Sequence, residues 1–303
     1  MSNAVIRNAQ LTELPHLKAI WRSVFGYGGE DAFYRIFFNP DLCVVADYDS
    51  APVSMGYLVP FGDIQCGKDS IPCAMIFAVA TLPKYRGLGL GRLIVNELVR
   101  LAHELGYQAI VLCPSEDSLF EYYEAHSEMT DWFYAYEHTF HKLSNINMIT
   151  DSPPLTELTI GEYSVSREGL LKDITHIKHG PRIFEYQVAL NEEHGGGFYK
   201  IGNACATIEL QSDGTVWVKE LLIPQLLTNS SESEKLAFVL ESNNEVTNIL
   251  ATIAYTFPAS EHVIRAPVRS GEGRRFGMLT MVDSMNGNIE SGEYAPWYGL
   301  AFD

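Results

Sequence analysis

Residues 77–113 contain a strand, a glycine-rich turn, a helix and a second strand in direct succession, and no other feature constrains the fold as strongly. Between the first strand and the helix, residues 86–92 carry three glycines and two arginines. Leucine and isoleucine then recur at three- and four-residue spacing up to Leu105, which predicts one apolar helical face. Gly106 would end that helix, and the apolar residues 109–113 predict a buried strand. The region therefore predicts a βαβ unit, whose crossover is right-handed.

The turn at residues 86–92 suits a phosphate group. Its glycines, Gly87, Gly89 and Gly91, let backbone N–H groups approach an anion without interference from a Cβ atom. The N-terminus of the following helix favours negative charge at the same place. The dinucleotide fingerprint G-x-G-x-x-G is not met, because the third glycine comes one residue early, and no Gly-Lys-Ser/Thr closes a nucleoside-triphosphate loop. The alternative is a glycine-rich turn that only precedes a core helix.

The pattern Arg86-x-x-Gly89-x-Gly91, with the lead-in of residues 79–85, resembles the acyl-CoA pyrophosphate motif of the GNAT N-acetyltransferase superfamily. In that motif an Arg or Gln opens the pattern R/Q-x-x-G-x-G/A. The resemblance covers residues 5–142. It includes a short helix over residues 114–124, where Tyr123 aligns with the family's tyrosine, and it departs where Ser-Glu at 127–128 replaces the usual Gly-Phe.

This resemblance implies that acetyl-CoA is the co-substrate and that an amine attacks its thioester directly, without an enzyme nucleophile. Tyr123 would protonate the leaving thiolate or donate a hydrogen bond to it. A backbone N–H near Val79 would polarise the thioester carbonyl, and the backbone of residues 78–81 would pair with the pantetheine arm. The residues implied for CoA binding are Val79, Ala80, Thr81, Arg86, Gly87, Leu88, Gly89, Leu90, Gly91 and Arg92. Glu30 and Asp31 are candidates for taking a proton from the acceptor through water, with a surface or capping role as the alternative.

The length of 303 residues, 47% of them hydrophobic, suits two domains. A Pro-Pro pair at 153–154 disfavours helix and marks a linker. We expect an acyl-CoA-binding N-acetyltransferase domain over residues 5–145, a linker over 146–158 and a second domain over 159–303. The expected fold class is α/β (α+β), with an acetyltransferase-like mixed central sheet flanked by helices and a degenerate acetyltransferase-like domain after it.

The second domain is expected to repeat the order strand, helix, strand. Two strands flank a turn at 212–214, a helix covers 246–257, and three strands follow at 262–267, 277–282 and 297–302. No R-x-x-G-x-G joins strand to helix, since residues 225–242 occupy that junction. This order resembles the tandem enhanced-intracellular-survival type without its third domain. The resemblance implies a second domain that binds no CoA and shapes the acceptor side of the first, and it suggests an active-site role for the carboxylate of Asp303.

The formal net charge of −17 argues against a nucleic-acid partner. It suits a cationic acceptor, a small-molecule or peptide amine, although an acidic surface also serves solubility alone. No apolar run has the length of a membrane span, and residues 1–4 resemble a remnant of expression more than a targeting signal, so we expect a cytoplasmic protein. Cysteines and histidines lack metal-site spacing, so no metal is expected. The cysteines are expected to be free thiols, with a Cys66–Cys73 disulfide as the alternative.

Three classes of function are compatible with the sequence. The first is an acetyl-CoA-dependent N-acetyltransferase that acts on a primary amine. The second is a non-catalytic acyl-CoA-binding sensor or regulatory module, in which the acceptor pocket has closed. The third is a partner-binding module that has the fold without the ligand, and homo-oligomers are compatible with all three. The intact glycine loop and Tyr123 favour the enzyme.

Overall fold

The computed structural model describes residues 4–26, 28–48, 50–141, 153–224, 227, 244–282 and 292–302. The strands are β1 (Val5–Asn8), β2 (Cys43–Tyr48), β3 (Ala51–Cys66), β4 (Asp69–Thr81), β5 (Ala109–Leu112), β6 (Thr130–His141), β7 (Leu155–Leu158), β8 (His176–His179), β9 (Gly196–Ile201), β10 (Ala204–Leu210), β11 (Val216–Leu222), β12 (Glu261–Ala266) and β13 (Arg274–Met281). The helices are α1 (Leu14–Phe25), α2 (Glu30–Phe37), α3 (Leu90–Glu104), α4 (Asp117–Ser127), α5 (Ile160–Leu171), α6 (Pro181–His194) and α9 (Asn244–Thr256). Short 3-10 turns cover Leu11–Glu13, Pro40–Leu42 and Pro83–Tyr85.

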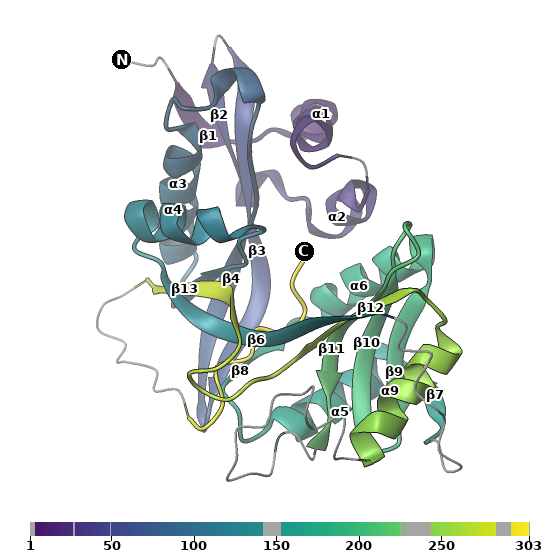
Figure 1. Ribbon diagram of the computed structural model, residues 1–303. Coiled ribbons are helices and arrows are strands. Elements are labelled where there is room, and N and C mark those ends of the chain that lie inside the picture. The colour runs from purple at the N-terminus through teal and green to yellow at the C-terminus, as the bar shows by residue number, and fades with distance from the viewer. Residues whose placement is uncertain are drawn as a thin grey trace.

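All strands of the described residues belong to one 13-stranded sheet (Figure 1). Its order is β1-β2-β3-β4-β5-β13-β6-β12-β11-β10-β9-β7, and β8 pairs with β3 outside this path. The pairs β4–β5 and β11–β12 are parallel, whereas the other paired strands are antiparallel. The structure therefore has the mixed central sheet, flanked by helices, that the sequence predicts.

Strands of the two halves alternate in the middle of this sheet. β13 comes from the second half of the chain, yet it lies between β5 and β6 of the first half. β6 in turn pairs with β12 along residues 136–141. The end of the expected linker, residues 155–158, forms β7 and pairs with β9. The two halves thus share one sheet, and the domain boundaries stay a prediction.

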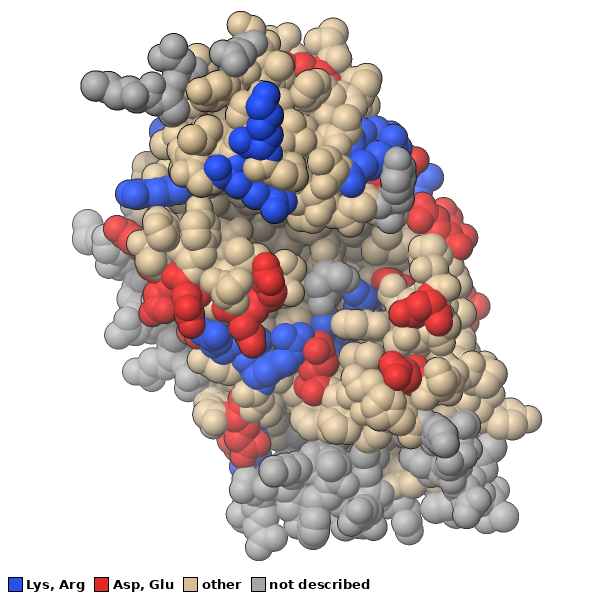
Figure 2. Space-filling model, turned by 45° about the horizontal axis from the view of Figure 1, so that its top comes forward, with Lys and Arg blue, Asp and Glu red and all other residues tan. Residues whose placement is uncertain are grey.

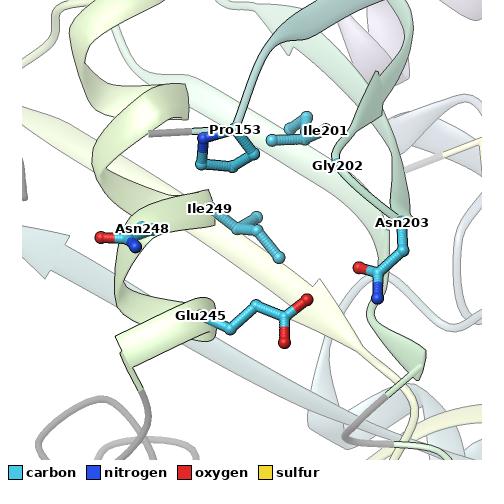
Figure 3. A pocket seen from close by; sticks show the side chains of 7 residues that line it. All are labelled: Pro153, Ile201, Gly202, Asn203, Glu245, Asn248 and Ile249. Atoms are coloured by element: carbon cyan, nitrogen blue, oxygen red, sulfur yellow. The ribbon is translucent and has the colours of Figure 1, made fainter. Parts of the chain in front are cut away.

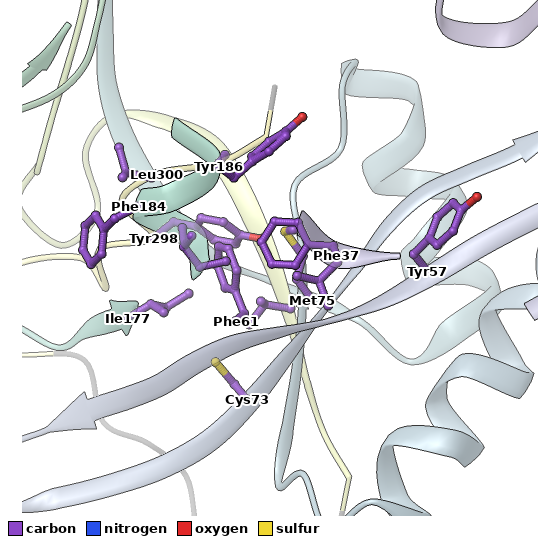
Figure 4. Close-up of a cluster of buried hydrophobic side chains, with 14 of the residues drawn as sticks. Phe37, Tyr57, Phe61, Cys73, Met75, Ile177, Phe184, Tyr186, Tyr298 and Leu300 are labelled. Atoms are coloured by element: carbon purple, nitrogen blue, oxygen red, sulfur yellow. The ribbon is translucent and has the colours of Figure 1, made fainter. Parts of the chain in front are cut away.

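Helices cover both faces of each half (Figure 1). In the first half, α3 and α4 pack on one face and α1 and α2 on the other. In the second half, α9 covers one face and α5 with α6 the other. Aromatic side chains from both halves form one buried cluster, in which Phe37 and Phe61 of the first half lie near Tyr186 and Tyr298 of the second (Figure 4). A shared apolar core therefore joins the halves on the face that carries α1, α2 and α6.

Both strand–helix–strand units that the sequence predicts are present. β4, α3 and β5 form the first unit, and β11, α9 and β12 form the second, each with parallel strands. Residues 225–242, which separate β11 from α9, lie outside the described residues except for Leu227. All five cysteines are free thiols. Among the helices that the structure describes, none is long and apolar enough to span a membrane.

The strand expected over residues 297–302 is wrong. Trp297 forms a single β-bridge with His176, and the segment that follows is irregular. Gly299 has φ of +78°, a left-handed conformation that interrupts an extended strand. Trp297 and Leu300 are nevertheless almost completely buried. The apolar pattern that predicts a strand here reflects a buried irregular segment.

Candidate active site

The two strands that flank α3 separate before β4 ends. β4 pairs with β5 only through Cys73, Ala74 and Met75, while its pairing with β3 continues to Thr81. In the described residues, the β5-facing edge of β4 therefore has no strand partner beyond Met75. A bare strand edge exposes N–H and C=O groups that can pair with an extended ligand.

A β-bulge re-aims the backbone on this open edge. Opposite Gly56 of β3 lie two residues of β4, Ala78 and Val79. Ala78 has φ of +47°, which is rare for a residue with a Cβ atom. The side chain of Phe77 packs on the α1–α2 face of the sheet, whereas that of Val79 packs on the α3 face. Bulges of this kind turn backbone groups away from the regular hydrogen-bond ladder. The N–H and C=O groups of β4 at the bulge are therefore not all used in pairing with β3.

Gly56 also brings α3 close to this edge. A Cβ atom at position 56 would lie 2.6 Å from Cγ2 of Ile94 and 3.0 Å from Cδ1 of Leu98. Only glycine fits such an approach without displacing the helix. The N-terminus of α3 is therefore held beside the bulge.

The glycine turn leaves the first turn of α3 uncapped. Gly87 and Gly89 have φ of +78° and +76°. Gly89 is the N-cap, no side chain caps the helix, and no acidic residue lies in the first turn. The N–H of Leu93 donates to the carbonyl of Gly89 at 3.2 Å, so the three preceding N–H groups lack an intrahelical acceptor. Free N–H groups and the helix dipole together suit an anion here.

Three basic side chains surround this helix end. Lys84, Arg86 and Arg92 are exposed, and none of them forms an ion pair within the described residues. The Arg86 Nε donates to the carbonyl of Thr81 at 3.2 Å, which ties the loop to the end of β4. On the face drawn in Figure 2, Lys and Arg side chains lie on the upper part of the surface, acidic side chains lie below them, and further Lys and Arg side chains lie lower still. Because the whole chain has a net charge of −17, the exposed side chains of Lys84, Arg86 and Arg92 form a local exception.

Tyr123 and its neighbour Tyr122 lie in different surroundings on α4. The Tyr123 ring is half-buried against the apolar cluster under α3, and burial raises the pKa of its hydroxyl to about 12. The hydroxyl of Tyr122 lies instead at the start of α3, 3.4 Å from the point where a Cβ on Gly91 would stand. The Tyr122 ring stacks on His126 with the ring centroids 4.8 Å apart. The family resemblance implies a catalytic role for Tyr123, which stays a prediction, whereas the sequence offers no signal for the position of Tyr122.

The two carboxylates considered as bases are engaged in ion pairs. Glu30 is buried and accepts from the Nε of Arg22 at 2.7 Å and from the N–H of Gly28 at 2.9 Å. Burial raises the pKa of Glu30, but these hydrogen bonds outweigh it and the pKa lies below its usual value. Asp31 pairs with Lys18 at 2.5 Å, and the hydrogen bond from this ammonium lowers the pKa of Asp31. These pairs favour the structural alternative for both residues.

The end of the chain reaches the opposite side of β4 from α3. The Phe302 ring lies 5.1 Å from the Phe77 ring, 4.4 Å from Tyr186 and 5.4 Å from Phe37, measured between centroids. Phe77 directly precedes the bulge, so the Phe77 ring lies between Phe302 and the open edge of β4. Asp303, whose carboxylate the sequence suggests as an active-site group, lies outside the described residues.

The second half has a cavity of a different character beside α9 (Figure 3). Its volume is about 280 Å³, and it is lined by Pro153, Ile201, Gly202, Asn203, Glu245, Asn248 and Ile249. Among the described residues that line it there is no Lys or Arg, and Glu245 contributes an acidic side chain. This lining does not suit the phosphates of CoA. Among the described residues, no group of three or more His, Cys, Asp or Glu side chains could hold a metal ion.

Comparison with known proteins agrees with this geometry. Residues 14–126 match the acetyltransferase (GNAT) family, and no curated protein sequence matches the chain. A GCN5-related N-acetyltransferase from Anabaena variabilis superposes with a TM-score of 0.68 at 14% identity, covering 93% of this chain and 73% of its own. Eis1 from Mycobacterium abscessus gives 0.60 at 11% identity, with 92% and 74% covered. A putative acetyltransferase from Pyrococcus horikoshii gives 0.58 at 15% identity, with 99% and 95% covered. The shared fold therefore extends over both halves.

Proposed function

We propose that this protein transfers an acetyl group from acetyl-CoA to a primary amine, in keeping with the match of residues 14–126 to the GNAT acetyltransferase family. The observation that carries the proposal is the open edge of β4 beside the uncapped N-terminus of α3. One feature offers backbone groups to an extended arm, and the other offers N–H groups to a pyrophosphate. Their adjacency matches a ligand with both parts, which acyl-CoA has.

In this proposal the pyrophosphate lies on residues 86–92, with N–H groups of the first turn of α3 as donors. Arg86 and Arg92 supply positive charge beside it. The pantetheine arm pairs with the backbone of Val79, Ala80 and Thr81 along the open edge. The acyl group then lies at the bulge, where a backbone N–H polarises the thioester carbonyl.

The neutral acceptor amine attacks the thioester carbonyl, so that a C–N bond forms and the C–S bond breaks, the nitrogen gives up one proton to water, and CoA leaves as the thiolate. Tyr123 is proposed to stabilise that thiolate. With its pKa raised to about 12, its hydroxyl remains protonated at neutral pH and is available as a donor. A thiol has a pKa of about 8.5, so complete proton transfer from Tyr123 would be uphill by about 5 kcal/mol. This difference in pKa supports a hydrogen bond from Tyr123 to the sulfur over complete proton transfer.

The second half is proposed to bind no CoA and to form a wall on the acceptor side of the first. Its β11–α9–β12 unit lacks the R-x-x-G-x-G sequence, and the described residues that line the cavity beside α9 include no Lys or Arg. The contact of Phe302, from the second half, with Phe77 of the first half supports the proposal that the second half lies beside the acceptor. The acceptor is a small-molecule or peptide amine, whose positive charge suits the acidic protein.

Release of free thiol from acetyl-CoA, measured across a panel of primary amines, tests this function. An acetyltransferase releases thiol at a rate that depends on the amine, and the acetylated amine appears by mass spectrometry in equal amount. The observation that favours the sensor alternative is the Phe302 ring, which packs on Phe77 at the side proposed for the acceptor. Saturable CoA binding without amine-dependent thiol release would support the sensor and contradict the enzyme.

A further inference from the structure

The last described segment of the chain, residues 297–302, is fixed by a buried polar cluster of the second half. At its centre, Glu220 of β11 is fully buried. Its carboxylate accepts from the hydroxyl of Tyr163 at 2.5 Å, from the Nε of Arg167 at 2.9 Å and from the indole Nε1 of Trp297 at 2.5 Å. Tyr163 and Arg167, both on α5, therefore hold the carboxylate that fixes the indole of Trp297, the first residue of the segment.

A second contact of this cluster fixes the middle of the segment. The N–H of Leu300 donates to Nε2 of His179 at 3.1 Å. Between the two anchors, Gly299 lies against the cluster itself. A Cβ atom there would stand 2.4 Å from Nη2 of Arg167 and 2.6 Å from Nε2 of His179. The segment consequently has little room to move relative to β8 and β11.

The backbone of the segment is also tied to the sheet of the first half. The N–H of Trp297 donates to the carbonyl of Thr175, and its carbonyl accepts from Ile177. Those two residues flank the first position of β8, which pairs with β3. β3 is also the strand that carries Gly56, opposite the bulge of β4. Residues 297–302 are thus held in a fixed position relative to β3 and β4, the strands beside the open edge.

We propose that Phe302 is a specificity-determining residue for the acceptor amine and that Arg167, His179, Glu220 and Gly299 position it. Phe302 covers Phe77, the residue before the bulge, so its ring bounds the space that an attacking amine must enter. The cluster residues act only through Phe302 and contact no substrate. This inference rests on the proposed function.

Substitution of Glu220 or Arg167 is a poor test, because an uncompensated buried charge can unfold the protein. Gly299→Ala is better, since its Cβ overlaps the cluster and must displace the segment. Gly214→Ala is the matched control, because Gly214 has φ of +86° and nothing within 4 Å of a Cβ. It carries the same left-handed strain in the β10–β11 turn, without the overlap. Phe302→Ala removes the ring directly.

For the amine that the wild type uses best, Phe302→Ala and Gly299→Ala should each lower kcat/KM at least tenfold, chiefly through KM of the amine. Bulkier amines should gain relative to small ones, and the Kd of CoA should change less than twofold. Gly214→Ala should match the wild type. The double variant Gly299→Ala/Phe302→Ala should be no worse than Phe302→Ala alone, since residues acting through one another are not additive.

Hydrogen exchange supplies a readout that is independent of activity. The Leu300 amide should lose protection in Gly299→Ala and retain it in Gly214→Ala. Continued protection in Gly299→Ala, multiplicative effects in the double variant, or an unchanged amine preference in Phe302→Ala would each overturn the inference. A wild type without transfer to any amine would instead contradict the proposed function, so the two failures are distinguishable.

Discussion

The charge at the start of α3 offers a sharp test of the CoA site. Gly89 is the N-cap, its φ is +76°, and nothing lies within 4 Å of a Cβ built on it. Asp and Asn both tolerate this left-handed conformation better than other residues do. Gly89→Asp and Gly89→Asn therefore place side chains of equal size at one position and differ by a single negative charge.

The magnitude follows from Coulomb's law. At about 5 Å in a medium with the dielectric constant of water, two unit charges repel by about 0.8 kcal/mol. A pyrophosphate with two negative charges would be repelled by about 1.7 kcal/mol, roughly a 15-fold loss of affinity. Partial exclusion of water by the ligand lowers the dielectric constant and increases this figure. Gly89→Asp should thus bind CoA at least tenfold more weakly than Gly89→Asn.

Stability should change in the opposite direction. A carboxylate at a helix N-terminus is favourable by about 0.3–1 kcal/mol, so the Asp variant should unfold at the same temperature as the Asn variant or a higher one. Isothermal titration with CoA measures the affinities, and thermal unfolding followed by circular dichroism measures the stabilities. Equal CoA affinity in two folded variants would refute the placement of the pyrophosphate on this loop.

Three further predictions address other parts of the site. Tyr123→Phe should slow turnover about 10²–10⁴-fold while the Kd of CoA changes little; nearly full turnover would leave Tyr123 a packing residue and direct attention to Tyr122. His179 has a pKa well below its usual value of 6.5, because burial disfavours the imidazolium and Arg167 repels it, so the unfolded chain binds a proton that the folded protein excludes. His179 should therefore contribute a fall in the free energy of unfolding of about 1.4 kcal/mol per pH unit as the pH drops below about 6.5, and in His179→Gln the total slope, measured in urea titrations at several pH values, should be smaller by one proton. CoA titration of the wild type should give one site per chain, and a stoichiometry of two would contradict a second half without a CoA site.

Local sequence patterns predict those helices and hairpins of this protein whose formation depends on residues close together in the chain. The apolar spacing after Gly89 predicts α3, and the turn at 212–214 predicts the β10–β11 hairpin. The parallel pairing of β11 with β12 follows from the order strand, helix, strand. These features depend on neighbours in the chain, so the sequence carries them directly.

Features that depend on distant partners are not predictable in this way. Nothing in residues 274–281 indicates that β13 inserts between β5 and β6, because any apolar strand edge can accept it. The left-handed conformation of Ala78 is not predictable either, because a positive φ is usually indicated by a glycine and this residue is an alanine. Phe302 looks like the end of a strand, and only the contacts with Phe77 and Tyr186 reveal its place. The CoA loop could thus be proposed from the sequence, whereas the acceptor side could not.

The buried cluster around Glu220 is better explained by positioning than by stability. A buried ion pair such as Arg167–Glu220 is often no more stable than well-packed apolar side chains of similar volume, because both charges lose their hydration. Hydrogen bonds to charged groups, however, demand particular geometry. Here they fix the indole of Trp297, and His179 fixes the amide of Leu300. Since β13 and β6 already join the halves through one sheet, the cluster is not needed to hold them together. What it adds is a defined position for the segment that ends at Phe302, beside the strand edge where acyl transfer is proposed.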